Sequence, residues 1–278
     1  MKSIHGLLIA AMLSAAVPAH AQVSFDRSRD RGPGVSTSLF GVYVQPGELL
    51  VYPFFEYYRD NNLEYEPFDF GHVDQTEHRG RYRAKEGLVF VGYGISERLA
   101  VEFEIAGISA ALDKSPLDTS TLAPRLEESG LGDVEGQLRW RWRRETDNRP
   151  ELFSYFETVI PTAETGSLIG TSEWEFKLGF GVIRGMRWGT ITARAAIATE
   201  GGTVEPGEYA FEYLKRLSDR FRVFGAIEGN QDEVELITEA QVFLARNVFL
   251  KLNNAFGVTS KATDWAPEIG VMFVIPTR

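Results

Sequence analysis

Side chains alternate between apolar and polar at every second position along most of this chain. The segment VEGQLRWRWR, for example, places Trp140 and Trp142 on one side and Arg139, Arg141 and Arg143 on the other. A period of two residues is that of a β-strand, which carries one set of side chains on each face. In a soluble sheet the charged face meets water, whereas in a transmembrane barrel the apolar face meets lipid and the arginines point inward.

The N-terminus predicts export. The first segment, MKSIHGLLIAAMLSAAVPAHA, contains Lys2, an apolar stretch over 6–17 and an A-x-A motif at 19–21, which together are typical of a secretory signal peptide cleaved after Ala21. The apolar stretch is too short to cross a bilayer, and none after it is long enough for a membrane helix. Any membrane span must therefore consist of strands.

Composition excludes several classes of site. The chain has no cysteine, so disulfides, thiolate chemistry and cysteine-bound zinc are all excluded. Its formal net charge of −10 and its pI near 5.1 argue against binding nucleic acid through phosphates.

Periodicity predicts twelve strands, and the links between them alternate between short and long. Outer-membrane barrels have this alternation because their periplasmic turns are short and their external loops long. A soluble β-sandwich with Greek-key connections, the alternative fold, has no reason to alternate so regularly. Trp142, Trp174, Trp188 and Trp265 lie near predicted strand ends, as expected for aromatic girdles at two membrane interfaces. The predicted strands are 48–58, 83–94, 97–108, 132–144, 151–161, 172–185, 188–199, 207–217, 221–229, 233–244, 247–257 and 265–276.

These patterns predict an all-β fold, a transmembrane antiparallel up-and-down β-barrel of about twelve strands over residues 47–278, located in the cell outer membrane. Residues 1–21 are the expected signal peptide, and residues 22–46 form an N-terminal periplasmic or lumen lead-in. The charged run 26–31 is expected to be mobile. Residues 36–44 form either an extra strand or a partial plug folded into the barrel.

Several segments resemble a known group of barrels. They are PGELLVYPFFEYYRD (46–60), ESGLGDVEGQLRWRW (128–142), GEYAFEYLKRLSDR (207–220), EGNQDEVELITEAQ (228–241) and DWAPEIGVMF (264–273). They look like an uncharacterised group of Gram-negative outer-membrane barrels, similar to the barrels of the phenol-degradation MetA-pathway family that are usually described as transporters. The GLGD at 130–133 resembles that broader family's strand-start signature. The resemblance covers most of the mature chain and implies a barrel and a transport role, without an established substrate or site residues. The chain departs from many such barrels by ending on VIPTR rather than on an aromatic residue.

Charged residues on the inward faces of the predicted strands form the candidate site. Arg139, Arg141 and Arg143 repeat every second residue, so they would lie roughly 6.6–7 Å apart along one wall. The charges form either an open path that guides a polar solute or a salt-bridge network that fills a narrow lumen. If a pore exists, their mixed signs predict weak ion selectivity. The other predicted lumen- or pore-lining residues are Glu102, Glu104, Glu135, Glu157, Glu173, Glu175, Lys177, Arg194, Glu212, Arg216, Glu235, Glu239, Lys251 and Glu268.

No catalytic or metal site is predicted. His72 and His78 are the only histidines after the signal peptide, and both fall in the link 59–82, where a histidine is usually solvated. The turn 230–233 is rich in oxygen ligands, but a short hairpin rarely supplies the about six to eight that calcium takes. The strand glycines lack the P-loop pattern, and no G-x-S-x-G motif is present. We therefore expect no enzyme activity and no cofactor.

The expected function is passive. The chain is predicted to be a channel or transporter that passes a small hydrophilic or amphipathic solute through a charged lumen. The first alternative is a closed barrel with a structural or surface-interaction role, and the second is an outer-membrane enzyme that uses a loop histidine. Expected partners are outer-membrane lipid and lipopolysaccharide, an unknown small-molecule solute and, during biogenesis, the barrel assembly machinery, with no nucleic acid.

Overall fold

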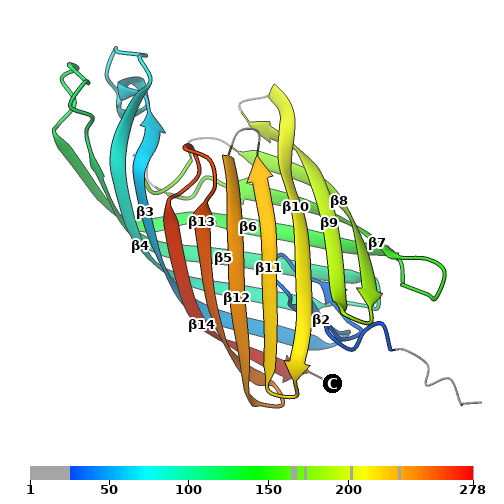
Figure 1. Cartoon of the computed structure of the whole chain (residues 1–278). Helices are drawn as coiled ribbons and strands as arrows, with labels where there is room; N and C mark the ends of the chain where they lie inside the picture. The colour runs from blue at the N-terminus through cyan, green and yellow to red at the C-terminus, as the bar shows by residue number, and fades with distance from the viewer. Residues whose placement is uncertain (1–25, 164–167, 172–173, 201–202, 231–232, 278) are drawn as a thin grey trace, which may run out of the picture.

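The chain folds into one closed ring of strands. A computed structural model describes residues 26–163, 168–171, 174–200, 203–230 and 233–277, so the predicted signal peptide lies outside the described residues. Twelve antiparallel strands neighbour one another in sequence order from β3 to β14, and β14 pairs with β3 to close the barrel (Figure 1). The prediction of a twelve-stranded up-and-down β-barrel is confirmed.

The strands lie where the alternation predicts them, but β3 to β6 and β10 are each at least three residues longer than expected. In β3 to β6 the inward-facing apolar row continues with residues such as Leu63 and Leu126, which pack around Tyr65. The links predicted at 59–82 and 109–131 are therefore partly strand, and the extended ends of β3 to β6 lie together at the end of the barrel with the long links (Figure 1). The strands are β3 (Glu48–Tyr65), β4 (His78–Gly94), β5 (Leu99–Asp113), β6 (Arg125–Arg143), β7 (Glu151–Ile160), β8 (Glu175–Met186), β9 (Gly189–Glu200), β10 (Thr203–Ser218), β11 (Phe221–Asn230), β12 (Glu233–Ala245), β13 (Val248–Gly257) and β14 (Trp265–Pro276).

The outward face of the barrel is a belt of exposed apolar side chains. A soluble monomer rarely exposes so large a continuous apolar surface, which is the surface that a transmembrane barrel presents to lipid. Trp142 and Trp188 lie at the end with the short turns, and Trp174 and Trp265 lie at the end with the long links, each of them exposed. The belt includes Phe55, Phe103, Phe156, Phe180, Ile197, Phe211, Ile227, Leu252 and Ile269. Within the described residues, no helix is long and apolar enough to cross a membrane.

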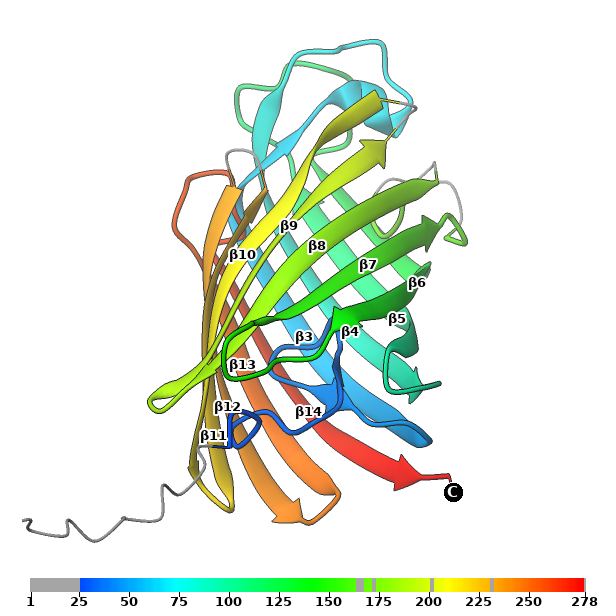
Figure 2. The ribbon, with the colours of Figure 1, turned by 90° about the vertical axis from the view of Figure 1, so that its right-hand side faces the viewer.

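Residues that precede the first barrel strand lie inside the barrel. They form a small antiparallel pair, β1 (Val35–Ser36) and β2 (Tyr43–Val44), which is a separate two-stranded sheet. Figure 2 shows this N-terminal segment within the end of the barrel where the C-terminus lies. A single short 3₁₀ helix is present among the described residues, η1 (Pro67–Phe70), in the link between β3 and β4.

Candidate functional site in the lumen

The N-terminal segment enters the barrel from the end with the short turns and folds back on itself. After the hairpin, the chain is held at Gly47, just before β3 begins. The Gly47 amide donates to the Gly94 carbonyl (2.8 Å), and the Thr277 amide donates to the Gly47 carbonyl (2.8 Å). Residues 35–44, which precede this point, form the lumen hairpin. Its turn contains Gly41, which has a φ of 62° and no room for a side chain, since a Cβ atom would lie 2.9 Å from Leu214 Cδ1.

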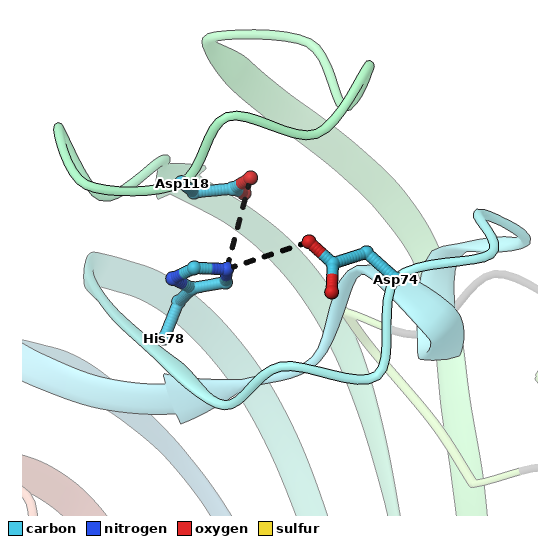
Figure 3. A group of neighbouring side chains, drawn as sticks. All are labelled: Asp74, His78 and Asp118. Atoms are coloured by element: carbon cyan, nitrogen blue, oxygen red, sulfur yellow. Dashed lines mark ion pairs between the residues drawn. The ribbon is translucent and has the colours of Figure 1, made fainter.

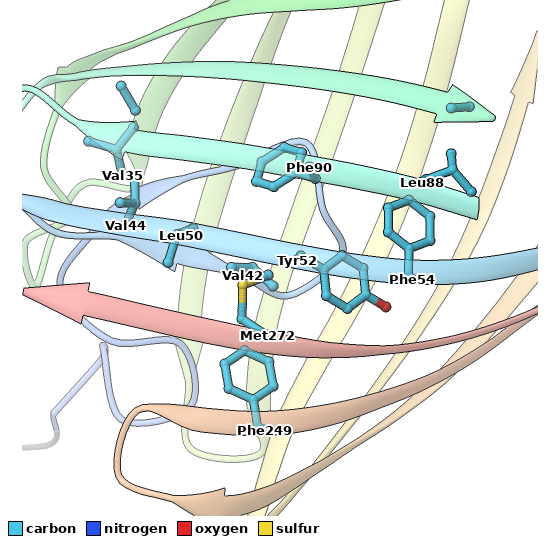
Figure 4. Packing of buried hydrophobic residues seen from close by; sticks show 12 residues of the cluster. Val35, Val42, Val44, Leu50, Tyr52, Phe54, Leu88, Phe90, Phe249 and Met272 are labelled. Carbon is cyan, nitrogen blue, oxygen red and sulfur yellow. The ribbon is translucent and has the colours of Figure 1, made fainter. Parts of the chain in front are cut away.

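Apolar side chains of the lumen hairpin contact both walls. Val35, Val42 and Val44 are fully buried in a cluster with side chains of β3, β4, β13 and β14 (Figure 4). On the opposite side, Phe40 stacks on Phe224 of β11, with ring centroids 5.1 Å apart. The hairpin therefore spans the lumen from wall to wall. The barrel's members of the first cluster are Leu50, Tyr52, Phe54, Leu88, Phe90, Ala100, Ala106, Phe249 and Met272.

Arg31 anchors the base of the hairpin through a buried charge cluster. Its guanidinium lies 2.9 Å from Glu145 and 3.0 Å from Glu151, and the three side chains are at most 4% exposed. Arg141 joins the cluster, because its Nε lies 3.1 Å from Glu151 and its Nη2 donates to the Pro33 carbonyl (3.0 Å). Buried charges are costly unless they are paired, so each of these side chains depends on the others.

A second set of contacts holds Asp30. Its carboxylate accepts a hydrogen bond from the Arg216 amide (3.0 Å), and its carbonyl accepts one from Arg222 (3.4 Å). Asp30 and Arg31 are 2% and 6% exposed. The expectation that the run 26–31 is mobile is wrong for these two residues, because each finds a partner of opposite charge or a hydrogen-bond partner on the lumen wall.

Hydrogen bonds fix the tip of the hairpin. Ser38 donates from its amide (2.8 Å) and its hydroxyl (2.6 Å) to one carboxylate oxygen of Glu102. The other oxygen of Glu102 lies 3.5 Å from Arg139 Nε, and Gln241 donates to the Phe40 carbonyl (3.2 Å). Glu102 therefore binds the N-terminal segment directly, and Arg139 compensates the charge of Glu102.

Little space remains beside the hairpin. The gap between the hairpin and the wall residues Arg139, Phe153, Thr192 and Arg194 measures about 10 Å³. A single water molecule needs roughly that much space. The hairpin thus fills the space beside these wall residues.

Beyond the hairpin, towards the long links, the lumen opens into a polar chamber of about 320 Å³. Lys177 lies there, 2.7 Å from Glu157 and 3.0 Å from Glu208. Arg194 lies between the chamber and the hairpin. It is 2.7 Å from Glu228 and also contacts Glu208. The carboxylates that line the chamber are Glu157, Glu175, Glu208, Glu228, Glu233 and Glu235.

Glutamates also face one another on the opposite wall. Glu56 pairs across the sheet with Glu86 on β4 and with Glu268 on β14, and Glu104 pairs with Glu135 on β6. Carboxyl groups that lie directly opposite one another in this glutamate belt repel when both are ionised, and a cation between them would relieve that repulsion. The outer half of the lumen is acidic, whereas the arginines gather around the hairpin. Both signs therefore line the lumen, with carboxylates in excess in its outer half, where Lys177 also lies, and most arginines around the hairpin.

The arginine row ends sooner than the alternation predicts. Arg139 and Arg141 point into the lumen and are almost fully buried. The strand register shifts between Arg141 and Arg143, and the Arg143 Nε donates to the Pro150 carbonyl (3.2 Å) in the short turn. Arg143 therefore binds the turn rather than the hairpin.

The remaining predicted lumen residues fall into the same groups. Lys251 lies 3.0 Å from Glu239, and both are buried near the hairpin. Arg216 lies over the ring of Phe243 (4.9 Å), and Glu212 contacts Arg194 (2.9 Å). Glu173 lies outside the described residues, as does part of the turn 230–233.

Sequence reasoning missed several carboxylates of the site, which include Glu56 and Glu86 of the glutamate belt and three that contact cations, Glu145, Glu151 and Glu208. Glu145 and Glu151 flank the short turn between β6 and β7, so they resemble ordinary turn residues. Glu208 follows a register shift between Pro206 and Tyr209 that interrupts the alternation. The available signal was the alternating charge of DRSRDR at 26–31, which needs acidic and basic partners if it is buried.

The GLGD motif holds an external link in place. One oxygen of Asp133 accepts the amides of Thr162 (2.8 Å) and Ala163 (2.9 Å), and the other accepts the amide of Thr171 (2.5 Å). The Gly132 carbonyl accepts the Thr162 hydroxyl (3.2 Å). The motif therefore shapes the link between β7 and β8 at the rim of the barrel.

Comparison with known proteins supports the fold. No protein-family model matches the chain, and a search of curated proteins finds no match. Among solved structures, the chain is similar to an outer-membrane channel from Pseudomonas putida F1, with 12% identity and a TM-score of 0.60 over 84% of this chain and 97% of the channel. It is also similar to the translocator domain of the autotransporter NalP from Neisseria meningitidis, with 11% identity and a TM-score of 0.51 over 82% of this chain and 88% of that domain. At these identities the likeness shows the barrel fold, which is the fold that the sequence resemblance implies.

Proposed function

We propose that the protein is a passive channel of the cell outer membrane whose lumen is closed by its own hairpin. The observation that carries this proposal is that β1 and β2 form a separate sheet, with no strand pairing to the wall. The hairpin is held by side-chain contacts, so it can leave its place without breaking the barrel's hydrogen-bonded ring. The similar barrel from Pseudomonas putida F1 is itself a channel.

The dimensions and charge of the lumen support a polar solute. Barrels of about eight strands fill their interior with side chains, whereas twelve strands enclose a wider lumen. Here a segment of the chain takes up that extra width, and its release would leave a path. The acidic chamber and the glutamate belt raise the local concentration of cations, so a small cationic or neutral polar solute fits better than an anion.

The outer surface supports contact with lipopolysaccharide. Arg59 lies directly opposite Arg83, and Lys85 follows two positions along, beside Tyr57. We name Arg59, Arg83 and Lys85 the outer basic patch. In the part of the chain that the structure describes, no carboxylate forms an ion pair with these three side chains, whereas neighbouring Arg81 lies 3.7 Å from Asp113.

An anion from outside the chain would relieve this repulsion. A surface hollow of about 520 Å³ is lined by the cations Arg83, Lys85 and Arg125, by Ser109 and Ser129, and by the carboxylates of Glu127 and Glu128. Tyr57 contacts Trp265 (6.0 Å between centroids), and such aromatic pairs mark the membrane interface. Phosphates of outer-leaflet lipopolysaccharide would therefore lie level with the patch. We also propose that the barrel assembly machinery inserts this protein into the outer membrane.

Single-channel conductance in planar bilayers tests the proposal. We expect wild-type protein to open rarely, Arg31→Ala to open often, and Arg27→Ala to behave like wild type, since Arg27 pairs with the exposed Asp147. Open channels should prefer cations, and Glu56→Gln/Glu104→Gln should weaken that preference.

The second candidate function is a permanently closed barrel with a structural role, which the gap of about 10 Å³ beside the hairpin favours. Silence from wild type and from Arg31→Ala, with insertion shown by protease protection, would establish that role and refute the channel.

A further inference from the structure

Two long external links pack against each other and form one unit. Residues 66–77 connect β3 to β4, and residues 114–124 connect β5 to β6. The Tyr65 hydroxyl donates to Asp118 (2.9 Å) and accepts a hydrogen bond from the Ser115 amide (2.9 Å). Tyr65 is also buried in an apolar cluster that includes Leu122. Side chains at this contact therefore have fixed positions.

Three potential metal ligands converge between the two links (Figure 3). The Nε2 atom of His78 lies 3.8 Å from a carboxylate oxygen of Asp74 and 3.8 Å from one of Asp118, and the ligand atoms all lie within 4.8 Å of one another. The His78 side chain is only 10% exposed, and its Nε2 atom is buried without a hydrogen bond. The Asp118 side chain is fully buried.

The carboxylates are already oriented by other contacts. One oxygen of Asp74 accepts the Thr76 amide (2.9 Å), which leaves the other oxygen facing His78. Asp118 accepts hydrogen bonds from Tyr65 and from the Ser120 amide (2.7 Å). Burial raises the pKa of Asp118, but these hydrogen bonds and nearby Lys114 outweigh it and lower the pKa to about 2.

A buried polar atom without a partner is uncommon, and a distance of 3.8 Å is too long for a hydrogen bond. A tetrahedral zinc ion, with bonds of about 2.0–2.2 Å to nitrogen and oxygen, holds its ligand atoms roughly 3.4 Å apart. The two distances from His78 to the carboxylates would need to shorten by about 0.4 Å, and the two carboxylate oxygens, which lie within 4.8 Å of each other, would need to approach to about 3.4 Å. We propose that Asp74, His78 and Asp118 form a binding site for a divalent transition-metal ion, best matched by zinc, that joins the two external links.

Lys114 sets an upper bound on the affinity. Its Nζ atom lies 3.5 Å from Asp118 and donates to the carbonyls of Ser120 (2.7 Å) and Leu122 (3.1 Å). These carbonyls keep the ammonium group beside the site, where it repels a metal cation. Lys114→Met removes this charge and should tighten zinc binding.

Zinc titration of the purified, tag-free mature protein in detergent tests the site. After treatment with EDTA, calorimetry with zinc chloride should give one site per chain, and zinc should protect the two links from protease. His78→Ala should weaken binding at least about 100-fold. His72→Ala is the matched control, because His72 is in the same link but its Nδ1 atom bonds to Thr121 (2.9 Å).

A second variant guards against misfolding of the link. Asp74→Asn keeps the oxygen that accepts the Thr76 amide but removes the ligand charge, and it should weaken binding at least about tenfold. Wild-type protein that binds no zinc below 100 μM, as an approximate threshold, would overturn the proposal. Zinc binding that survives in His78→Ala, or that falls equally in His72→Ala, would also overturn it.

Discussion

Replacing Arg31 with alanine should release the lumen hairpin. The change leaves the buried carboxylates of Glu145 and Glu151 without one of their cations. Breaking a buried ion pair by removing one partner costs about 3–5 kcal/mol. The lower end applies here, because Glu151 keeps Arg141 (3.1 Å) and Glu145 keeps Arg184 (3.3 Å).

This free-energy cost destabilises only the state in which the hairpin is docked, because release of the hairpin exposes the carboxylates of Glu145 and Glu151 to water. About 3 kcal/mol corresponds to a rise of roughly 100-fold or more in the ratio of released to docked hairpin. Arg27→Ala removes an ion pair with Asp147, whose side chain is 89% exposed, and a hydrogen bond to the Gly185 carbonyl (3.2 Å), but it leaves no buried carboxylate without a cation. Such a surface pair contributes at most about 1 kcal/mol, so the control should change the ratio by less than about fivefold.

Thiol labelling measures this ratio directly, because the natural chain has no cysteine. Ser36 is 7% exposed and its buried hydroxyl makes no hydrogen bond, so Ser36→Cys is a mild reporter inside the hairpin. A water-soluble maleimide should label Cys-substituted protein at a rate proportional to the released fraction. Equal labelling rates in the Arg31→Ala and Arg27→Ala backgrounds, with both barrels folded by gel mobility, would refute the reasoning.

Three further predictions concern the wall, the rim and the outer surface. Gly181→Ala would place a Cβ atom 2.2 Å from Phe153 Cζ, so urea unfolding in lipid vesicles should reveal a loss of about 1–3 kcal/mol. Gly87→Ala, where no atom lies within 4 Å, should change stability by less than about 0.5 kcal/mol. Asp133→Ala should increase amide exchange in the link after β7, and unchanged exchange would show that its hydrogen bonds do not hold the link. Neutralising the outer basic patch with serine should reduce the lipopolysaccharide that co-purifies with the protein, and an unchanged amount would exclude the patch as its site.

The barrel could be predicted from the sequence because each strand carries its own pattern. Alternation within β12 or β14 identifies a strand without knowledge of its neighbours. The upper parts of β3 and β6 escaped prediction because the register shifts between Asp60 and Leu63 and between Ile105 and Gly107. Each shift moves the apolar row by one residue, so a search for strict alternation stops there.

The sequence leaves open whether residues 36–44 form an extra strand or a partial plug inside the barrel, and it cannot decide between the two. The pairs Val35–Ser36 and Tyr43–Val44 are too short to have a period, and their burial depends on barrel side chains that are distant in sequence. The charged run before them resembled a solvated lead-in, because its buried partner Glu151 is distant in sequence. Likewise, His78 was placed in a loop, although it begins β4 beneath a second link that supplies Asp118.

The apolar cluster under the hairpin also includes both edges of the sheet that must meet last. Leu50 and Tyr52 belong to β3, whereas Met272 belongs to β14, and Val42 and Val44 of the hairpin are buried in the same cluster. Pairing of the first and last strands is the contact of longest sequence separation in the ring, and such contacts are slow to form. A hairpin that offers apolar surface to both edges acts as an internal template for ring closure. The same segment that blocks the finished lumen would thus help the barrel to form, and weakening its hold would slow assembly as well as open the path.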